Sequence, residues 1–178
     1  NASAKARSLA DRGKPFQDPN YHFRMTTNNL YPALNYNSDE LSCAMGISSL
    51  ARLQSTINSR HKIAKKIDTL LKTSKVVSPA NLEISNSKSS IFFHTVTVDT
   101  DRLKVSKVQF ANAIAAEGIT LNTDFRDITS EWKWISKYTS GIQKTPNTLN
   151  FRNKTFNILF NENFGDPEIE DIIDSILK

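Results

Sequence analysis

The sequence contains only five glycines, and no two of them are close together. Neither a G-x-G-x-x-G nor a G-x-x-x-x-G-K-[ST] motif can therefore be written anywhere in the chain, because both need closely spaced glycines. This excludes nucleotide binding by a glycine-rich loop. No G-x-S-x-G motif is present either, so the sequence offers no nucleophile elbow.

Cysteine and histidine are also scarce. The single cysteine, Cys43, cannot form an internal disulfide, and His22, His61 and His94 lie far apart without a zinc-binding spacing. We therefore expect no metal site and a reducing, cytoplasmic location. Because His94 follows two phenylalanines in a predicted strand, we expect it to be a structural rather than a catalytic histidine.

Long hydrophobic runs are absent. The longest apolar stretches, such as 91–93, are much shorter than a membrane span, and the first dozen residues carry several charges. We expect neither a membrane span nor a signal peptide.

The composition that remains is that of a folded domain. The chain has 178 residues, of which 38% are hydrophobic and 23% charged, and this is ordinary for a globular protein. Residues 1–88 hold 13 lysines and arginines against 6 acidic residues, and much of this excess falls between Arg60 and Lys75. No aromatic residues interleave with these cations, so a solvated helix face explains them better than a nucleic-acid surface.

Hydrophobic periodicity predicts one long helix, approximately 39–72, with a capping pattern formed by Asn37 and Glu40. Apolar and small residues recur on one stripe at Gly46, Leu50, Leu53, Ile57, Arg60, Ala64, Ile67 and Leu71, joined near the ends by Leu41, Met45 and Leu70. Such a helix would be roughly 50 Å long. Because this exceeds the diameter of a small domain, we expect part of it to contact another domain or subunit.

The rest of the chain predicts shorter elements. We expect helices at 5–12, 106–117 and 166–177, strands at 76–77, 90–98, 119–121 and 156–160, and irregular segments at 14–37 and 122–150. Asp166 is expected to be the N-cap of the last helix, with Pro167 at its first position. The order indicates an α+β fold: a small antiparallel or mixed sheet covered by helices, with one long N-terminal helix.

One segment carries a family resemblance. Asn35-Tyr36-Asn37-Ser38-Asp39-Glu40-Leu41, followed by Ala44-Met45-Gly46, resembles the N-Y-R-M-S-E-L-Q-A-A-x-G region of the DegT/DnrJ/StrS aminotransferases. These enzymes use pyridoxal phosphate to aminate keto-sugars. Further blocks at 9–13, 90–98, 110–119 and 158–174 resemble family blocks in the same order, so the resemblance covers nearly the whole chain.

The resemblance implies that the chain is the C-terminal portion of a fold-type I transaminase. Residues 1–37 would form a short helix and an irregular segment leading from the large domain, and residues 38–178 the C-terminal α+β domain. The family's Schiff-base lysine lies upstream of such a portion, so we expect this piece by itself to be inactive and not to hold the cofactor. The implied partners are the large pyridoxal-phosphate-binding domain of the same chain, a second subunit of a homodimer, a keto-sugar and an amino donor.

The resemblance also assigns candidate residues. Asn35 matches a family asparagine that reaches across the dimer to the cofactor phosphate, although it could instead serve only to start the long helix. Tyr36 and Asn37 match positions near the substrate, and Asn37 departs from the family's usual arginine or lysine, which leaves recognition of a nucleotide diphosphate open. Trp132 and Trp134, with Phe125, either line the substrate entrance or belong to the core.

Two functions follow from these observations. The first is the C-terminal domain of a pyridoxal-phosphate-dependent aminotransferase acting on a keto-sugar, either nucleotide-linked or an aminocyclitol precursor. The alternative is a non-catalytic binding or regulatory module with the same small-domain fold. A lysine at the family's Schiff-base position in the upstream sequence would favour the enzyme.

Overall fold

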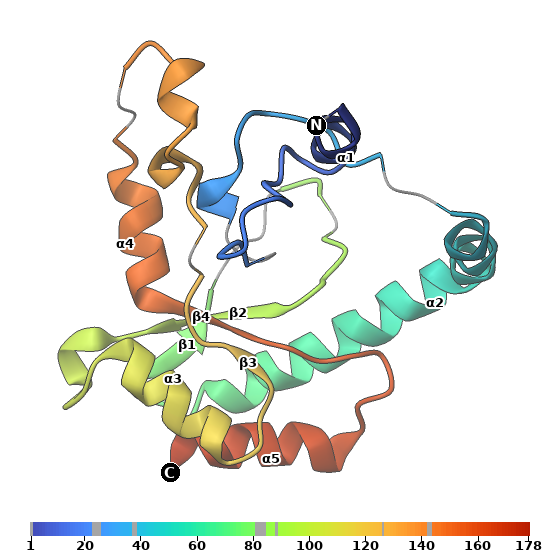
Figure 1. The fold of residues 1–178 in the computed structure, drawn as a ribbon. Coiled ribbons are helices and arrows are strands. Elements are labelled where there is room, and N and C mark those ends of the chain that lie inside the picture. Colours follow the sequence, from blue (N-terminus) through green and yellow to red (C-terminus); the bar gives the residue numbers. More distant parts are fainter. Residues whose placement is uncertain are drawn as a thin grey trace. The chain divides into compact units, whose positions relative to one another are not determined.

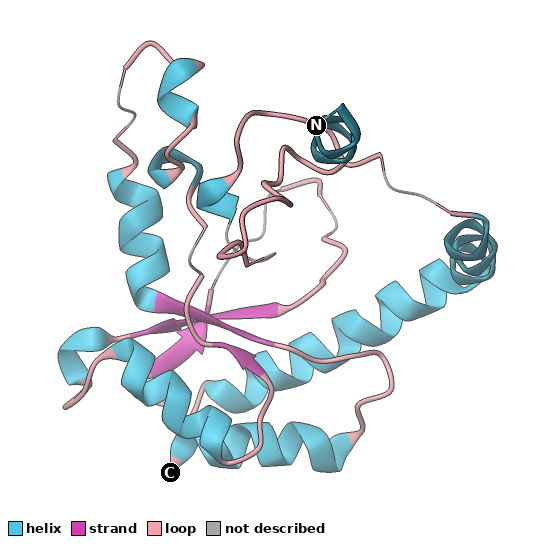
Figure 2. Ribbon diagram, in the orientation of Figure 1, coloured by secondary structure: helices cyan, strands magenta, loops and turns pink. Residues whose placement is uncertain are grey.

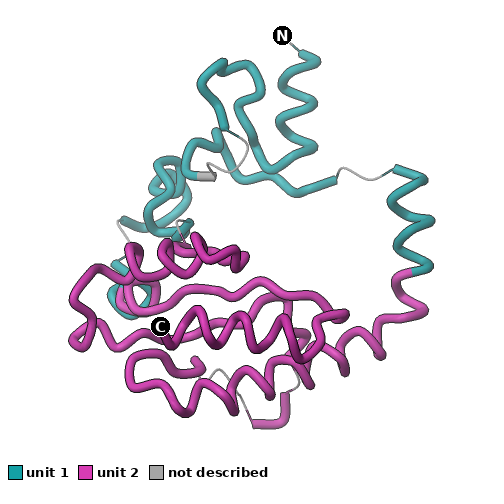
Figure 3. The backbone as a smooth tube through the Cα atoms, turned by 90° about the horizontal axis from the view of Figure 1, so that it is seen from below, with its two compact units in different colours: residues 1–48, 126–149 teal, residues 49–125, 150–178 magenta. Residues whose placement is uncertain are grey.

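A computed structural model describes residues 2–22, 26–36, 39–80, 85–87, 89–125, 127–141 and 144–178 (Figure 1). The chain forms two compact units, coloured separately in Figure 3. Unit 1 contains residues 1–48 and 126–149, and unit 2 contains residues 49–125 and 150–178.

Unit 2 is built on a four-stranded antiparallel sheet, drawn in magenta in Figure 2. Its strands are β1 (Val77–Pro79), β2 (His94–Val98), β3 (Leu121–Asn122) and β4 (Thr155–Ile158), in the spatial order β1-β2-β4-β3. In the central pair, Val96 of β2 lies opposite Phe156 of β4. The sheet is thus antiparallel throughout, which resolves the antiparallel or mixed alternative of the sequence.

The strands alternate between an apolar and a polar face, as a period of two requires. Val96, Phe156 and Ile158 are buried in the core, whereas Thr95 and Asn157 lie on the opposite face. The Thr95 hydroxyl donates to the Asn157 side-chain oxygen at 2.9 Å, so this buried polar pair is mutually satisfied.

Three helices cover the apolar face of the sheet: α2 (Glu40–Leu71), α3 (Lys107–Ala116) and α5 (Asp166–Leu177) (Figure 2). The α2 side chains in the core are Ile63, Ala64, Ile67 and Leu71. One face of α5 contributes Ile169, Ile172, Ile173 and Ile176. The predicted α+β class, with a small sheet, covering helices and one long helix, is confirmed.

The predicted apolar stripe of α2 is only half correct. Its C-terminal half packs on the sheet, but Leu41, Met45, Leu50 and Leu53 are exposed. The periodicity is real along the whole helix, but the sheet is too small to cover 32 residues. Among the helices of the described segments, none combines the length and hydropathy of a membrane span.

Several predicted boundaries need correction. The strands expected at 76–77, 119–121 and 156–160 lie at Val77–Pro79, Leu121–Asn122 and Thr155–Ile158. The N-cap of α5 is Gly165, not Asp166, and the Gly165 backbone N–H donates to the Glu168 carboxylate at 2.8 Å. The strand expected at 90–98 begins only at His94.

The sequence predicts an irregular segment at 122–150, but the last residues of this segment are helical. Helix α4 occupies Pro146–Lys154, and the Leu149 N–H donates to the Thr145 carbonyl at its start. None of its residues is buried, so the helix leaves no apolar stripe in the sequence from which it could be predicted.

Among its described residues, unit 1 contains helix α1 (Ala2–Ala10) and three single turns of 3₁₀ helix at Thr26–Asn28, Thr129–Glu131 and Ile135–Lys137. A further 3₁₀ turn, Thr100–Arg102, lies in unit 2. Helix α1 ends at Ala10, close to the predicted end near residues 11–12.

Candidate functional site

The chain turns sharply where it leaves α1. Arg12 and Gly13 both adopt positive φ angles, 59° and 73°. At Gly13 the turn needs a glycine, because an added Cβ would lie 2.1 Å from the carbonyl oxygen of Tyr31. The turn therefore brings residues 30–36 against residues 10–13.

The two segments are joined by backbone hydrogen bonds. The donor and acceptor pairs are Arg12 N to Leu34 O (3.2 Å), Leu30 N to Gly13 O (2.8 Å) and Tyr36 N to Ala10 O (2.9 Å). Asp11 and Asn35 form an antiparallel β-bridge at the centre of this pairing. The backbone at Asn35 and Tyr36 is consequently fixed by the end of α1, 22 or more residues away in the sequence.

A buried carboxylate organises the charges of this turn. The side-chain oxygens of Asp11 accept hydrogen bonds from Arg12 Nε at 2.9 Å and from Lys14 Nζ at 2.7 Å. Burial by itself raises the pKa of Asp11, but the hydrogen bonds and charges of Lys14 and Arg12 outweigh it and lower the pKa. Asp11 is therefore ionised at neutral pH.

Cations outnumber this carboxylate. The Arg7 guanidinium lies 4.3 Å from the centroid of the Phe16 ring, and Lys14 Nζ lies 5.8 Å from the same centroid. Arg12 and Lys14 both pair with the single carboxylate of Asp11, so this group carries a net positive charge, and Arg7 adds a further cation beside Phe16. We call Arg7, Asp11, Arg12 and Lys14 the basic turn.

The candidate residues of the sequence lie beside the basic turn. Asn35 is exposed, and within the described residues its side-chain amide has no hydrogen-bond partner. Tyr36 is also exposed, with 70% of its surface accessible. Asn37 lies outside the described residues. An exposed, unpaired amide next to cations is a chemically suitable donor for a phosphate oxygen.

The alternative role of Asn35, starting the long helix, is served by another residue. The Asp39 carboxylate accepts hydrogen bonds from the Ser42 backbone N–H at 2.8 Å and from the Ser42 hydroxyl at 2.7 Å. Both bonds lower the pKa of Asp39, and the bond from the backbone N–H has the larger effect. Sequence reasoning missed Asp39, although an aspartate directly before a helix is an ordinary N-terminal signal.

The tryptophans of unit 1 pack on each other. The Trp132 and Trp134 ring centroids are 5.2 Å apart, and Tyr138 makes an edge contact with Trp134. Trp134 is buried, which favours the core alternative for this residue over pocket lining. Phe125 belongs to unit 2 and is 47% exposed.

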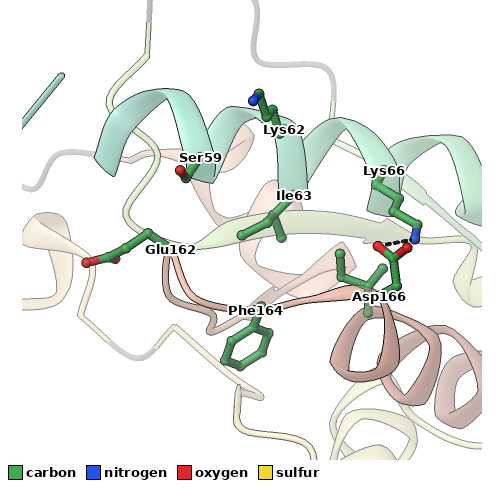
Figure 4. A pocket seen from close by; sticks show the side chains of 8 residues that line it. Ser59, Lys62, Ile63, Lys66, Glu162, Phe164 and Asp166 are labelled. Atoms are coloured by element: carbon green, nitrogen blue, oxygen red, sulfur yellow. Dashed lines mark ion pairs between the residues drawn. The ribbon is translucent and has the colours of Figure 1, made fainter. Parts of the chain in front are cut away.

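Unit 2 carries a shallow pocket of about 250 Å³ between the middle of α2, the loop after β4 and the start of α5 (Figure 4). In Figure 4, Lys66 and Asp166 point toward each other, and their ion pair measures 2.5 Å. Glu162 is held by Arg60, which also donates to the carbonyl oxygens of Ile91 and Phe92. Most charges of this pocket are thus already compensated within the fold.

His94, expected to be a structural residue, packs against the long helix. It is buried at the start of β2, and its Nε2 lies 2.7 Å from Oδ1 of Asp68 on α2. In the part of the chain that the structure describes, no group of three histidine, cysteine or acidic side chains could hold a metal ion.

Comparison with known proteins identifies the fold. The model of the DegT/DnrJ/EryC1/StrS aminotransferase family matches residues 1–177. The chain belongs to this family. This confirms the resemblance carried by residues 35–46, and the family is pyridoxal-phosphate dependent. A search of curated proteins found no match.

Solved structures agree. The aminotransferase TlmJ of Streptoalloteichus hindustanus superposes with a TM-score of 0.64 at 19% identity, over 97% of this chain and 43% of that one. PseC of Helicobacter pylori, an aminotransferase involved in the biosynthesis of pseudoaminic acid, gives 0.67 at 14% identity, over 97% and 44%. Spr1654 of Streptococcus pneumoniae, assigned as a sugar aminotransferase and solved in its PLP form, gives 0.65 at 17% identity, over 96% and 41%.

At these identities the similarity establishes the fold alone. This chain spans less than half the length of each of these structures, consistent with a C-terminal portion of such a protein. The residues present fit one end of the cofactor: the unpaired amide of Asn35 beside the basic turn suits a phosphate group.

Proposed function

We propose that this chain is the C-terminal part of a pyridoxal-phosphate-dependent aminotransferase that converts a keto-sugar, nucleotide-linked or an aminocyclitol precursor, into its amino form. The observation that carries the proposal is the family match over residues 1–177. The names of two structural relatives, a sugar aminotransferase and an enzyme of pseudoaminic acid biosynthesis, support the sugar class.

In this proposal residues 1–37 lead from the large domain, and residues 38–178 form the C-terminal domain. The large domain holds the cofactor ring and supplies the reactive lysine, and two subunits complete each active site. The bound cofactor carries the amino group from the donor to the keto-sugar. The isolated chain would not catalyse this transfer.

The residues of this chain bind and orient. Asn35 donates its side-chain amide to the cofactor phosphate held by the neighbouring subunit. Tyr36, fixed by its backbone hydrogen bond to Ala10, presents an exposed ring and hydroxyl to the substrate. The side chain of Asn37 has no charge with which to neutralise a diphosphate, in contrast to the family's usual arginine or lysine.

The test uses the complete protein of which this chain is a part, purified and supplied with pyridoxal phosphate. An absorbance band of the bound cofactor that decays when glutamate or another amino donor is added would support the aminotransferase. The chain 1–178, treated identically, is the matched control and is expected to show no band. The Asn35→Ala variant of the complete protein should bind the cofactor more weakly, by about tenfold for one charge-assisted hydrogen bond.

A well-folded complete protein that shows no cofactor band would refute this proposal. That result, together with the absence of a lysine at the family's Schiff-base position, would support a non-catalytic binding or regulatory module with the same small-domain fold.

A further inference from the structure

The basic turn contains an arginine whose position nothing in the proposed function uses. Arg12 has a positive φ angle of 59°, a conformation that is strained for a residue with a side chain. Its Nε is tied to the buried Asp11 carboxylate at 2.9 Å, yet half of its side-chain surface remains accessible. The guanidinium is therefore both fixed and open to solvent.

The free side of this guanidinium has donors that are not used within the described residues. Within the described residues, the two terminal nitrogens of Arg12 have no hydrogen-bond partner, so up to four N–H groups are available. Lys14 occupies the other oxygen of Asp11 and is itself largely buried, so Arg12 is the accessible cation of the pair. Arginine binds phosphate in a bidentate manner and loses little entropy when its position is already fixed.

The β-bridge brings Asn35 to the same place. Residues directly opposite each other in an antiparallel bridge direct their side chains to the same face, with Cβ atoms roughly 5 Å apart. Asp11 and Asn35 are such a pair, and Arg12 is bound to the Asp11 side chain. Arg12 therefore binds the carboxylate of Asp11, and Asn35 lies opposite Asp11 with its side chain on the same face. Because two cations, Arg12 and Lys14, pair with this one carboxylate, the group keeps a net positive charge with which to attract an anion.

We propose that Arg12 and Asn35 together bind one phosphate group, with Arg12 supplying the charge and Asn35 an additional neutral donor. The inference rests on the proposed function for the identity of the phosphate, which belongs either to pyridoxal phosphate on the neighbouring subunit or to a nucleotide-linked substrate. The structure gives Arg12 this role through Asp11, which acts as the positioning residue for the guanidinium.

The experiment compares ligands with and without a phosphate in the complete protein. Dissociation constants for pyridoxal phosphate and for pyridoxal are measured by absorbance titration of the cofactor-free protein, for the wild type and for Arg12→Gln. We expect about a 10- to 100-fold loss of affinity for pyridoxal phosphate and an unchanged affinity for pyridoxal. Arg12→Lys, which keeps the charge but loses the fork, should give a smaller loss. It also serves if Arg12→Gln does not fold.

The chain offers a matched control. Arg102 also binds an aspartate, Asp99, through Nε at 2.9 Å, and its side chain is also exposed, but it lies in unit 2. Arg102→Gln therefore makes the same chemical change away from the basic turn and should leave both dissociation constants unaltered.

Two further ligands distinguish the sources of the phosphate. Uridine diphosphate tests a nucleotide-linked substrate, and inorganic phosphate, followed by ³¹P line broadening, tests the site without either organic group. A loss confined to pyridoxal phosphate assigns the cofactor, and a loss confined to uridine diphosphate assigns the substrate. An Arg12-dependent interaction with inorganic phosphate in a protein that does not bind the cofactor would retain the site and reject the proposed function.

The proposal is overturned if Arg12→Gln changes the affinity for none of these phosphate ligands, or weakens pyridoxal and pyridoxal phosphate equally. In that case Arg12 would serve only to hold the turn, and the aminotransferase proposal would be unaffected.

Discussion

The substitution Gly13→Ala tests the turn that presents Asn35. The new Cβ would lie 2.1 Å from Tyr31 O, whereas real Cβ atoms essentially never approach closer than 3.0 Å, so the backbone must shift by nearly 1 Å. The positive φ angle of 73° adds about 1–2 kcal/mol of conformational strain. The shift also breaks the hydrogen bond from Leu30 N to Gly13 O, which contributes about 1 kcal/mol. We expect a loss of about 3 kcal/mol in the stability of this turn.

Hydrogen exchange is the appropriate measurement, because the turn can open locally without unfolding unit 2. At the Leu30 amide, about 3 kcal/mol corresponds to a protection roughly a hundredfold lower than in the wild type. Two glycines provide controls. Gly118 has a φ of 98° but nothing within 4 Å of its Cβ position, so Gly118→Ala should cost only the conformational strain. Gly46 lies within α2 with open space around its Cβ position, so Gly46→Ala should stabilise the helix by up to about 1 kcal/mol.

The reasoning would be refuted if the Leu30 amide of Gly13→Ala exchanged at the wild-type rate. It would equally be refuted if Gly13→Ala and Gly118→Ala reduced local protection by the same amount, since the close approach to Tyr31 would then contribute nothing.

Three further predictions concern the free energy of unfolding, which urea denaturation measures. Ile67→Ala, at a fully buried position of α2, should cost about 2–5 kcal/mol, whereas Leu50→Ala, 69% exposed on the same helix, should cost much less; similar losses would contradict the packing described for α2. Thr95→Val should cost about 1–3 kcal/mol by leaving the buried Asn157 side-chain oxygen without its donor, and additive losses in a double variant with Asn157→Leu would reject this coupling. Folding lowers the pKa of Asp11 below 3.8, so its ion pairs stabilise the protein at neutral pH, and this stabilisation is lost as the pH falls through the pKa of the folded state. Asp11→Asn should therefore reduce the loss of stability on acidification. An unchanged dependence of stability on pH would refute this.

Local signals in the sequence were sufficient for much of the fold. The Ser106–Gln109 spacing predicts a capping box, and the structure shows both of its reciprocal hydrogen bonds. The periodicity of α2 predicts Ala64, Ile67 and Leu71 on its core face, and that of α5 predicts its isoleucines; the core of α2 also includes Ile63, which the predicted stripe lacks. These features depend on residues three or four positions apart, so the sequence determines them without knowledge of the remaining chain.

Family membership was likewise available from the sequence. The ordered blocks, from residues 9–13 to residues 158–174, resemble the aminotransferase family, and the family match over residues 1–177 confirms it. The resemblance also singled out Asn35 and Tyr36. It could not indicate Arg12, because nothing in the sequence joins residue 12 to residue 35.

The tertiary structure decided the features that depend on distant residues or on the absence of burial. Helix α4 buries none of its residues and therefore leaves no periodic signal, and the N-terminal half of α2 has the apolar pattern of a core helix but extends beyond the sheet that would cover it. The pairing of Asp11 with Asn35 depends on a turn at Gly13 that closes against Tyr31, 18 residues further along the chain. This pairing is held by backbone hydrogen bonds, which nearly all residue types can form. The identities of the paired residues therefore do not reveal the contact, and only the folded chain shows it.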